Sequence, residues 1–235
     1  MTQRSGTALI VAHGQPSDPD APEAEIAALA ARVARFLPGW QVGSATLAGI
    51  GTLDAAVRRL GAPLIFPLFM ADGWFTRVNL PRRLAAAGGE GLTILTSFGV
   101  LPDTLSLIGE VAAAACRDAR WAPADTTLIL AAHGSGVSRQ PAEAAAAARD
   151  AIAAAHDFRD IRLGFIEEPP YLADVLRDAG PMAVLLPLFV ARWGHVIGDI
   201  PDAVAASGFA GRVLDPIGLH PDVPAIVARA IAARA

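Results

Sequence analysis

Two histidines in the second half of the chain each follow a short hydrophobic run. His133 comes directly after TLILAA, His195 lies just past AVLLPLFVA, and Glu167 and Glu168 follow IRLGFI. Imidazole binds Fe(II), Co(II) and Ni(II), and it accepts a proton near neutral pH. Two histidines with one carboxylate leave exchangeable positions on a metal ion, unlike a closed structural site with four ligands. These residue types are suited to bind a divalent metal ion or to accept a proton.

The elements that would position these side chains are those of an α/β fold. Runs rich in Val, Ile and Leu are bounded by Gly, Pro or His, which is typical of parallel strands buried on both faces. Alanine-rich segments, such as residues 21–37 and 141–156, lie between the runs and favour helix. In open parallel sheets ligands bind beyond the carboxyl ends of the strands, so the polar groups above are expected at one rim.

The chain contains an internal duplication. TALIVAHG, which ends at Gly14, resembles TTLILAAHG, which ends at Gly134, at an offset of 120 residues (134 − 14). PLFMADGWFTRVNLP from Pro67 resembles PLFVARWGHVIGDIP from Pro187 at the same offset, and FGVLPD resembles IGLHPD. A repeat of this order and spacing predicts two similar doubly wound parallel-sheet lobes. We place them at residues 1–120 and 121–235, with the join within residues 117–126.

The first lobe carries an incomplete version of the polar set. His13 matches His133, but Phe75 stands at the position of His195. No acidic pair follows the matching strand before Asp54, which is expected to begin a helix. We therefore predict a degenerate site in the first lobe and one site in the second, with a structural role as the alternative for His13.

The remaining histidines and the cysteine have separate expectations. His220 follows RVLDPI and could join the site in the second lobe, so its participation stays open, as does that of His13. His156 ends an alanine-rich helix and is expected to be a solvated surface residue. Cys116 is the one cysteine of the chain, which excludes an intrachain disulfide, and we expect it to fill the core.

Composition and charge exclude several classes of protein. The formal net charge is −4 and the basic residues are scattered, so no footprint for nucleic acid or an acidic membrane surface is visible. The apolar stretches are shorter than the roughly 20 residues of a membrane span, and the N-terminus does not resemble a signal peptide. The HGSG turn lacks the third glycine of a dinucleotide motif. We expect a soluble, cytoplasmic protein with a small-molecule partner and no tightly bound cofactor.

The segments HGSGVSRQ, GFIEEPPYLADVL and PLFVARWGHVIGDIP resemble the motifs of CbiX-type sirohydrochlorin chelatases, a class II tetrapyrrole chelatase family. This resemblance implies two similar parallel α/β domains around a cleft, and insertion of Fe²⁺, for siroheme, or Co²⁺, for cobalamin, into sirohydrochlorin without ATP. It also implies that His133 and His195 bind the metal and act in catalysis together with Glu167. The neighbouring Glu168 is the alternative carboxylate. The alternative to a functional role for Glu167 is that it is a solvated loop residue.

The resemblance also names a substrate that needs cations. Sirohydrochlorin carries many carboxylates, and arginine is suited to bind them. We assign substrate binding to four residues in or near the motif loops: Arg77, Ser135, Arg139 and Arg192. Arg82 is a further arginine of this region, and Trp74 and Trp193 either line the macrocycle site or pack in the core.

Two other functions fit the same residues less fully. A non-catalytic carrier of metal or tetrapyrrole could use the same histidines without turnover. A metal-dependent hydrolase is a weaker alternative, because the sequence has no H-E-x-x-H or similar run. Because the duplication supplies two lobes in one chain, we predict a functional monomer.

Overall fold

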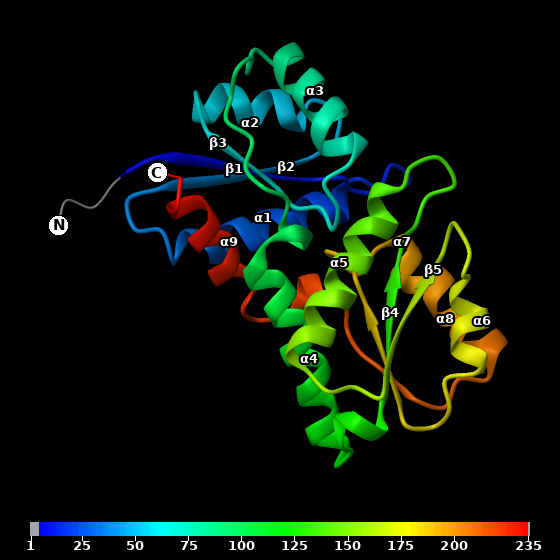
Figure 1. Cartoon of the computed structure of the whole chain (residues 1–235). Coiled ribbons are helices and arrows are strands. Elements are labelled where there is room, and N and C mark those ends of the chain that lie inside the picture. Colours follow the sequence, from blue (N-terminus) through cyan, green and yellow to red (C-terminus); the bar gives the residue numbers. More distant parts are fainter. Residues whose placement is uncertain (1–4, 235) are drawn as a thin grey trace. The chain divides into compact units, whose positions relative to one another are not determined.

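The computed structural model describes residues 5–234 and contains two compact units. The first unit combines the chain up to Phe98 with the segment from Pro221 onward, and the second unit is Gly99–His220 (Figure 1). Each unit is built on its own parallel sheet. The predicted fold class, two similar parallel α/β lobes, is confirmed.

The sheet of the first unit has the strand order β2-β1-β3, and all its pairs are parallel. Its strands are β1 (Thr7–Ala12), β2 (Gln41–Thr46) and β3 (Leu64–Pro67). The hydrophobic LTIL run at residues 92–95 contributes one parallel bridge to this sheet, between Ile94 and Ile65.

Helices cover both faces of this sheet. One face of β1 and β2 packs on α2 (Thr52–Leu60) and α3 (Leu80–Ala86) in a buried hydrophobic cluster. On the other side, α1 (Asp20–Ala34) contacts β2 and α9 (Val223–Ala232) contacts β3 and α1. Successive side chains of a strand point to opposite sides, so helices on both faces bury β1 and β3 and explain their continuous hydrophobic sequences. The edge strand β2 is more polar and only partly buried. Asp54 lies in the first turn of α2, as predicted.

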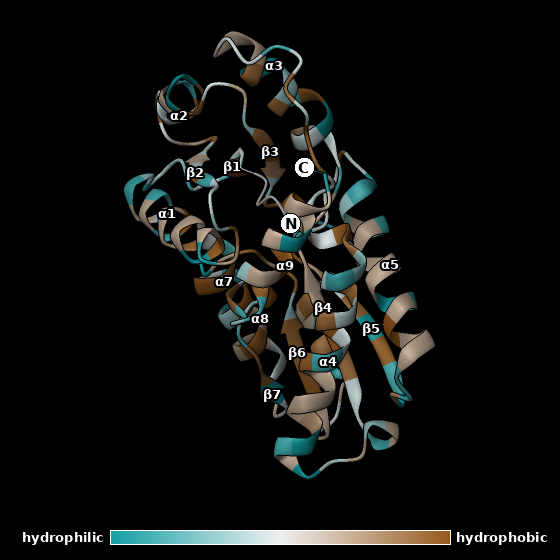
Figure 2. Cartoon of the chain, turned by 90° about the vertical axis from the view of Figure 1, so that its left-hand side faces the viewer, coloured by the Kyte–Doolittle hydropathy of each residue, from teal (hydrophilic) through white to brown (hydrophobic). Residues whose placement is uncertain are grey.

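The second unit repeats this plan with one more strand. Its order is β5-β4-β6-β7, again all parallel. The strands are β4 (Thr127–Ala132), β5 (Asp160–Phe165), β6 (Ala183–Pro187) and the two-residue β7 (Arg212–Val213). All residues of β4 and β6 are buried, and β6 is brown, the hydrophobic colour, in Figure 2.

Two helix pairs cover the faces of the second sheet. Helices α6 (Leu172–Arg177) and α8 (Asp199–Ser207) share a hydrophobic cluster with β4 and β6. Helices α4 (Pro102–Ala119) and α5 (Gln140–Ala155) pack on each other, and α4 contacts β6 while α5 contacts β4. A four-residue helix, α7 (Gly194–Ile197), precedes α8.

The boundary predicted at residues 120 and 121 differs from the division into compact units. Helix α4 ends the first sequence repeat, yet it packs in the second unit against α5. Helix α9 ends the second repeat and packs in the first unit against α1 (Figure 1). The two repeats thus exchange their last helices. Sequence similarity marks what was duplicated, whereas burial decides which sheet a helix covers.

The structure also shows the burial of Cys116 and His156, which lie outside the polar set. Cys116 is fully buried in α4, as expected, and this burial raises the pKa of its thiol. His156 is half-buried rather than solvated, because its ring lies against Gly109 of α4 and near Phe158. The prediction of a surface histidine was therefore wrong. None of the described helices is long and apolar enough to cross a membrane.

Candidate metal centre

The polar set of the second unit lies at the carboxyl ends of three adjacent strands. His133 follows β4, Glu167 follows β5, and His195 lies on α7 after β6. Strand β4 is central, and the chain moves from it to β5 on one side and then to β6 on the other. This reversal of direction is the topological switch point, where parallel α/β sheets bind their ligands.

The structure brings the three predicted residues together. The Nε2 atoms of His133 and His195 are 3.0 Å apart, and their rings meet edge to face at 86°. Ligand atoms of His133, Glu167 and His195 all lie within 4.8 Å of one another. Within residues 5–234, this is the one group of at least three His, Cys, Asp or Glu side chains whose ligand atoms lie close enough together to share a metal ion. Two imidazoles and a carboxylate suit Fe(II) or Co(II) and leave positions open.

Hydrogen bonds of the Nδ1 atoms orient both rings. Nδ1 of His133 is 2.8 Å from the carbonyl oxygen of Gly134, and Nδ1 of His195 is 2.9 Å from Oδ2 of Asp199. A carbonyl and a carboxylate accept hydrogen bonds, so each Nδ1 carries the proton and donates. Both Nε2 lone pairs then face each other across 3.0 Å. That arrangement is electrostatically unfavourable until a cation, either a metal ion or a proton, comes between them.

The two glutamates have different roles. The backbone N–H of Glu167 donates to the carbonyl of His133 at 2.9 Å, which ties the exposed Glu167 to the histidine loop. Glu168 instead accepts a hydrogen bond at Oε1 from the backbone N–H of Ser135 at 2.9 Å. Glu168 therefore stabilises the turn after His133. Glu167 is the carboxylate that lies close enough to His133 and His195 to share a metal ion with them.

The first unit preserves the frame of this site without its ligands. Nδ1 of His13 lies 3.0 Å from the carbonyl oxygen of Gly14, as in the second unit. Its ring meets Phe75 edge to face, with centroids 4.6 Å apart, where His133 meets His195 at 4.5 Å. The residue whose N–H bonds the carbonyl of His13 is Ala48, where the second unit has Glu167. A phenyl ring and a methyl group have thus taken the places of the second imidazole and the carboxylate.

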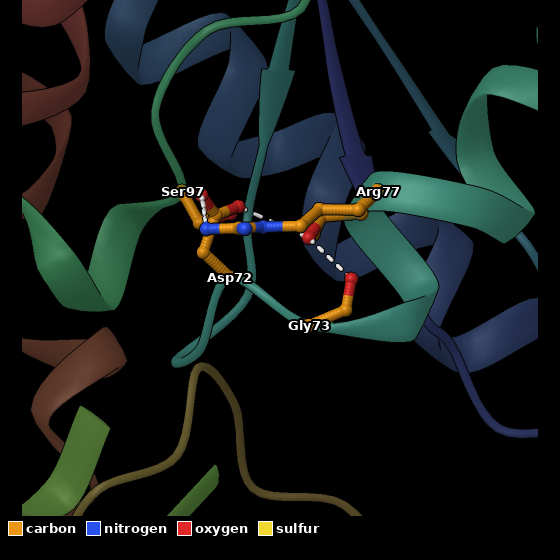
Figure 3. Close-up of polar contacts among 5 residues, drawn as sticks. Asp72, Gly73, Arg77 and Ser97 are labelled. Atoms are coloured by element: carbon orange, nitrogen blue, oxygen red, sulfur yellow. Dashed lines mark hydrogen bonds and ion pairs between the residues drawn. The ribbon is translucent and has the colours of Figure 1, made fainter. Parts of the chain in front are cut away.

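The predicted substrate arginines are exposed and paired with acidic residues. Arg192, which follows β6, forms an ion pair with Asp215, and Arg139 lies 3.7 Å from Glu143. In the first unit, Arg77 lies on a π-helical turn, Phe75–Asn79, and its Nη2 is 3.4 Å from Asp72. Figure 3 shows that the same aspartate accepts a hydrogen bond from Ser97. Exposed ion pairs of this kind contribute little stability, about 0–1 kcal/mol, so the arginines can exchange partners.

Three residues near the two histidines in sequence were not predicted from the sequence, and three predicted candidates do not belong to the His133–Glu167–His195 group. Asp199 was missed, although it lies four residues after His195. Val137 and Ile197, which are 99% and 61% exposed, flank the two histidines in sequence and offer apolar surface. The remaining candidates, which are not members of the three-residue group, are the half-buried His220 and Trp193 and the exposed Trp74.

Comparisons with known proteins identify relatives of this chain. The family model described as CbiX matches residues 127–234. A solved structure, CbiX described as the terminal enzyme for biosynthesis of siroheme in denitrifying bacteria, is 47% identical with a TM-score of 0.90, and the match covers 98% of this chain and 99% of that one. A search of curated proteins found no match.

More distant structures share the fold. SirB from Bacillus subtilis with Fe³⁺ is 13% identical with a TM-score of 0.77, and the match covers 97% of this chain and 95% of that one. The sirohydrochlorin chelatase SirB from Bacillus subtilis subspecies spizizenii in complex with cobalt is 14% identical with a TM-score of 0.71, covering 97% and 94%. At such identities the likeness concerns the fold alone. The relative that is 47% identical over nearly the full length of both chains decides the family: this chain belongs to the CbiX family.

Proposed function

We propose that this protein is a sirohydrochlorin chelatase, which inserts a divalent metal into the tetrapyrrole without ATP. The observation that carries the proposal is the pair of Nε2 atoms 3.0 Å apart, with Glu167 beside them, at the switch point of the second sheet. The siroheme enzyme that is 47% identical supports this substrate, and it favours Fe(II) over Co(II) as the metal. A cytoplasmic location stays a prediction.

Insertion requires the metal to lose water, two pyrrole nitrogens to lose their protons, and the ion to pass into the ring. In our proposal, Nε2 of His133 and His195 binds the incoming metal ion together with Glu167. With metal–nitrogen distances of about 2.1 Å, nitrogens 3.0 Å apart subtend an angle of roughly 90° at the ion. His133 and Glu167 are exposed, which supports exchange of the ion rather than retention. As the ion leaves, the two Nε2 atoms can accept one pyrrole proton between them, and the carboxylate of Glu167 can accept the other.

The substrate carboxylates need cations, and the apolar ring face needs apolar surface. We assign the carboxylates to Arg192, Arg139 and the hydroxyl of Ser135, which all belong to the second unit. A role for Arg77 of the first unit stays a prediction from the sequence. We assign the ring face to Val137 and Ile197, whose exposure is costly in water and is relieved when a macrocycle covers them.

Replacing Arg192 by alanine is expected to raise KM for sirohydrochlorin by about tenfold while kcat changes little, because one charge-assisted hydrogen bond is worth roughly 1.5–3 kcal/mol. Steady-state kinetics at varied sirohydrochlorin concentration measures both constants. Arg177→Ala is the matched control, since Arg177 is an exposed arginine of α6 that is paired with Asp174. An equal rise in KM in both variants would contradict the assignment.

The function itself is tested by mixing the purified protein anaerobically with sirohydrochlorin and either Fe(II) or Co(II). The expected result is a change in the absorbance spectrum that is faster than in a protein-free control and needs no ATP. An unaccelerated rate with both metals, while sirohydrochlorin still binds, would overturn the proposal and indicate a carrier.

We also propose that the protein acts as a monomer, because one chain supplies both repeats. Size-exclusion chromatography with light scattering is expected to give a mass near the 24.2 kDa of one chain. A stable mass of twice that value at micromolar concentration would contradict this prediction.

A further inference from the structure

The contact between His195 and Asp199 carries a role that the metal ligands alone do not explain. Oδ2 of Asp199 lies 2.9 Å from Nδ1 of His195, on the side of the ring away from His133. Between the two residues in sequence lies Gly198, whose N–H donates to the carbonyl of Gly194 at 2.9 Å. This bend from α7 into α8 places the carboxylate beside the imidazole.

The partner of Nδ1 determines what Nε2 can do. An imidazole that donates from Nδ1 keeps the lone pair on Nε2, whereas the other tautomer has a proton there and cannot bind a metal through that atom. His133 has the carbonyl of Gly134 as its acceptor, which is a backbone group that no substitution removes. His195 depends on a side chain for the same purpose.

The first unit offers an internal comparison. The positions equivalent to Phe189, His195 and Asp199, each 120 residues earlier, are Phe69, Phe75 and Asn79 (189 − 69, 195 − 75, 199 − 79). The first aromatic ring is retained, with centroids 6.3 Å apart for Phe69–Phe75 and for Phe189–His195. The imidazole and the carboxylate have both been replaced.

Asn79 shows what remains when the imidazole is absent. Its Oδ1 is buried and has no hydrogen-bond partner among the residues that the structure describes. A carboxylate in that place would be a buried charge without a partner, which is more costly than an amide. The aspartate is therefore suited to a unit whose histidine is present, and the fold itself does not require it.

We infer that Asp199 is a positioning residue of the chelatase: it holds His195 in the tautomer that directs the Nε2 lone pair toward the metal. This inference rests on the proposed function for its role in turnover. Its effect on metal binding is independent of turnover.

The test measures metal binding and tautomer state in the whole protein. We expect Asp199→Ala to weaken Co(II) binding by about tenfold to a hundredfold, the range seen when an outer partner of a ligating histidine is removed. Binding is followed by the visible absorption of Co(II) during anaerobic titration. In ¹⁵N NMR spectra of the metal-free protein, the His195 signals should shift toward those of a ring with mixed tautomers.

Asp202→Asn is the matched control, because Asp202 is an exposed carboxylate on the same helix. It should keep wild-type affinity and spectra. Asp199→Asn retains an acceptor oxygen and should lie between the wild type and Asp199→Ala. In the insertion assay, Asp199→Ala should lower kcat and leave KM for sirohydrochlorin near the wild-type value.

Two outcomes separate the inference from the proposed function. If wild-type protein does not accelerate insertion but Asp199→Ala still loses Co(II) affinity and shows the NMR change, the function fails and the positioning role stands. If Asp199→Ala binds Co(II) as tightly as Asp202→Asn and its His195 signals are unchanged, the positioning role is overturned, whatever the activity.

Discussion

Alanine at His133 or at His195 is expected to lower kcat for metal insertion by at least about a hundredfold, because each change removes both a metal ligand and a proton acceptor. The two Nε2 atoms are 3.0 Å apart and act on one ion, so the double variant should be little worse than either single one. Initial rates of the anaerobic absorbance change, after subtraction of the protein-free rate, measure this effect.

His13→Ala is the matched control for these variants. His13 has the same hydrogen bond from its ring to the following carbonyl, but its ring faces Phe75 and no second imidazole. We expect His13→Ala to retain most of the wild-type rate. A loss in this variant as large as that in His133→Ala would contradict a single site in the second unit.

Gly134→Ala is expected to have the second large effect, on both stability and activity. Gly134 has φ +71°, and a left-handed conformation costs a residue with a Cβ roughly 1–2 kcal/mol. The added Cβ would lie 2.8 Å from Cγ of Glu168 and 3.0 Å from Cβ of Phe165, so the turn must shift. Since a misplacement of about 1 Å can cost ~10²-fold in rate, kcat should fall strongly. Urea denaturation and the insertion assay measure the two effects.

Gly136→Ala is the matched control, because it also replaces a glycine of this turn but should not change the geometry of the turn. Gly136 belongs to the same turn, but the atom nearest to a Cβ there would be the carbonyl oxygen of Glu167, 4.0 Å away. This variant should unfold at nearly the wild-type urea concentration and keep its activity. If Gly134→Ala behaved as Gly136→Ala does, the turn would not be what orients His133.

The sequence predicted most of the fold and the proximity of His133, Glu167 and His195, for physical reasons. Strands buried on both faces leave continuous hydrophobic runs, and the repeat gave the runs of β1 and β3 a second example in β4 and β6. The carboxyl ends of adjacent parallel strands meet at one rim, so His133, Glu167 and His195 could be placed together before their distances were known. The same repeat predicted the degenerate frame around Phe75.

Other features depend on tertiary packing that the repeat does not encode. The exchange of α4 and α9 keeps every sequence signal of the two halves and changes only which sheet each helix covers. The half-burial of His156 follows from this exchange, because its ring lies against Gly109 of α4. The ion pairs of Arg192 and Arg77 involve exposed residues with no periodic signal.

Asp199 is the residue that the sequence could have revealed. It lies four residues after His195, and the repeat shows an asparagine at the matching position, where the histidine is a phenylalanine. Comparing the two halves for paired changes, rather than for single ligands, would have identified it.

The most direct test of the central claim is a single transfer of metal from protein to substrate. Protein loaded with less than one equivalent of Co(II) is mixed anaerobically with sirohydrochlorin, and the bound-cobalt band and the tetrapyrrole spectrum are followed together. If the His133–Glu167–His195 group delivers the ion, the cobalt band should decay at the rate at which the metallated tetrapyrrole appears. His195→Ala should show neither the decay of a bound-cobalt band nor the accelerated appearance of the product. Retention of cobalt on the wild-type protein while free Co(II) in solution is inserted at the protein-free rate would contradict the claim.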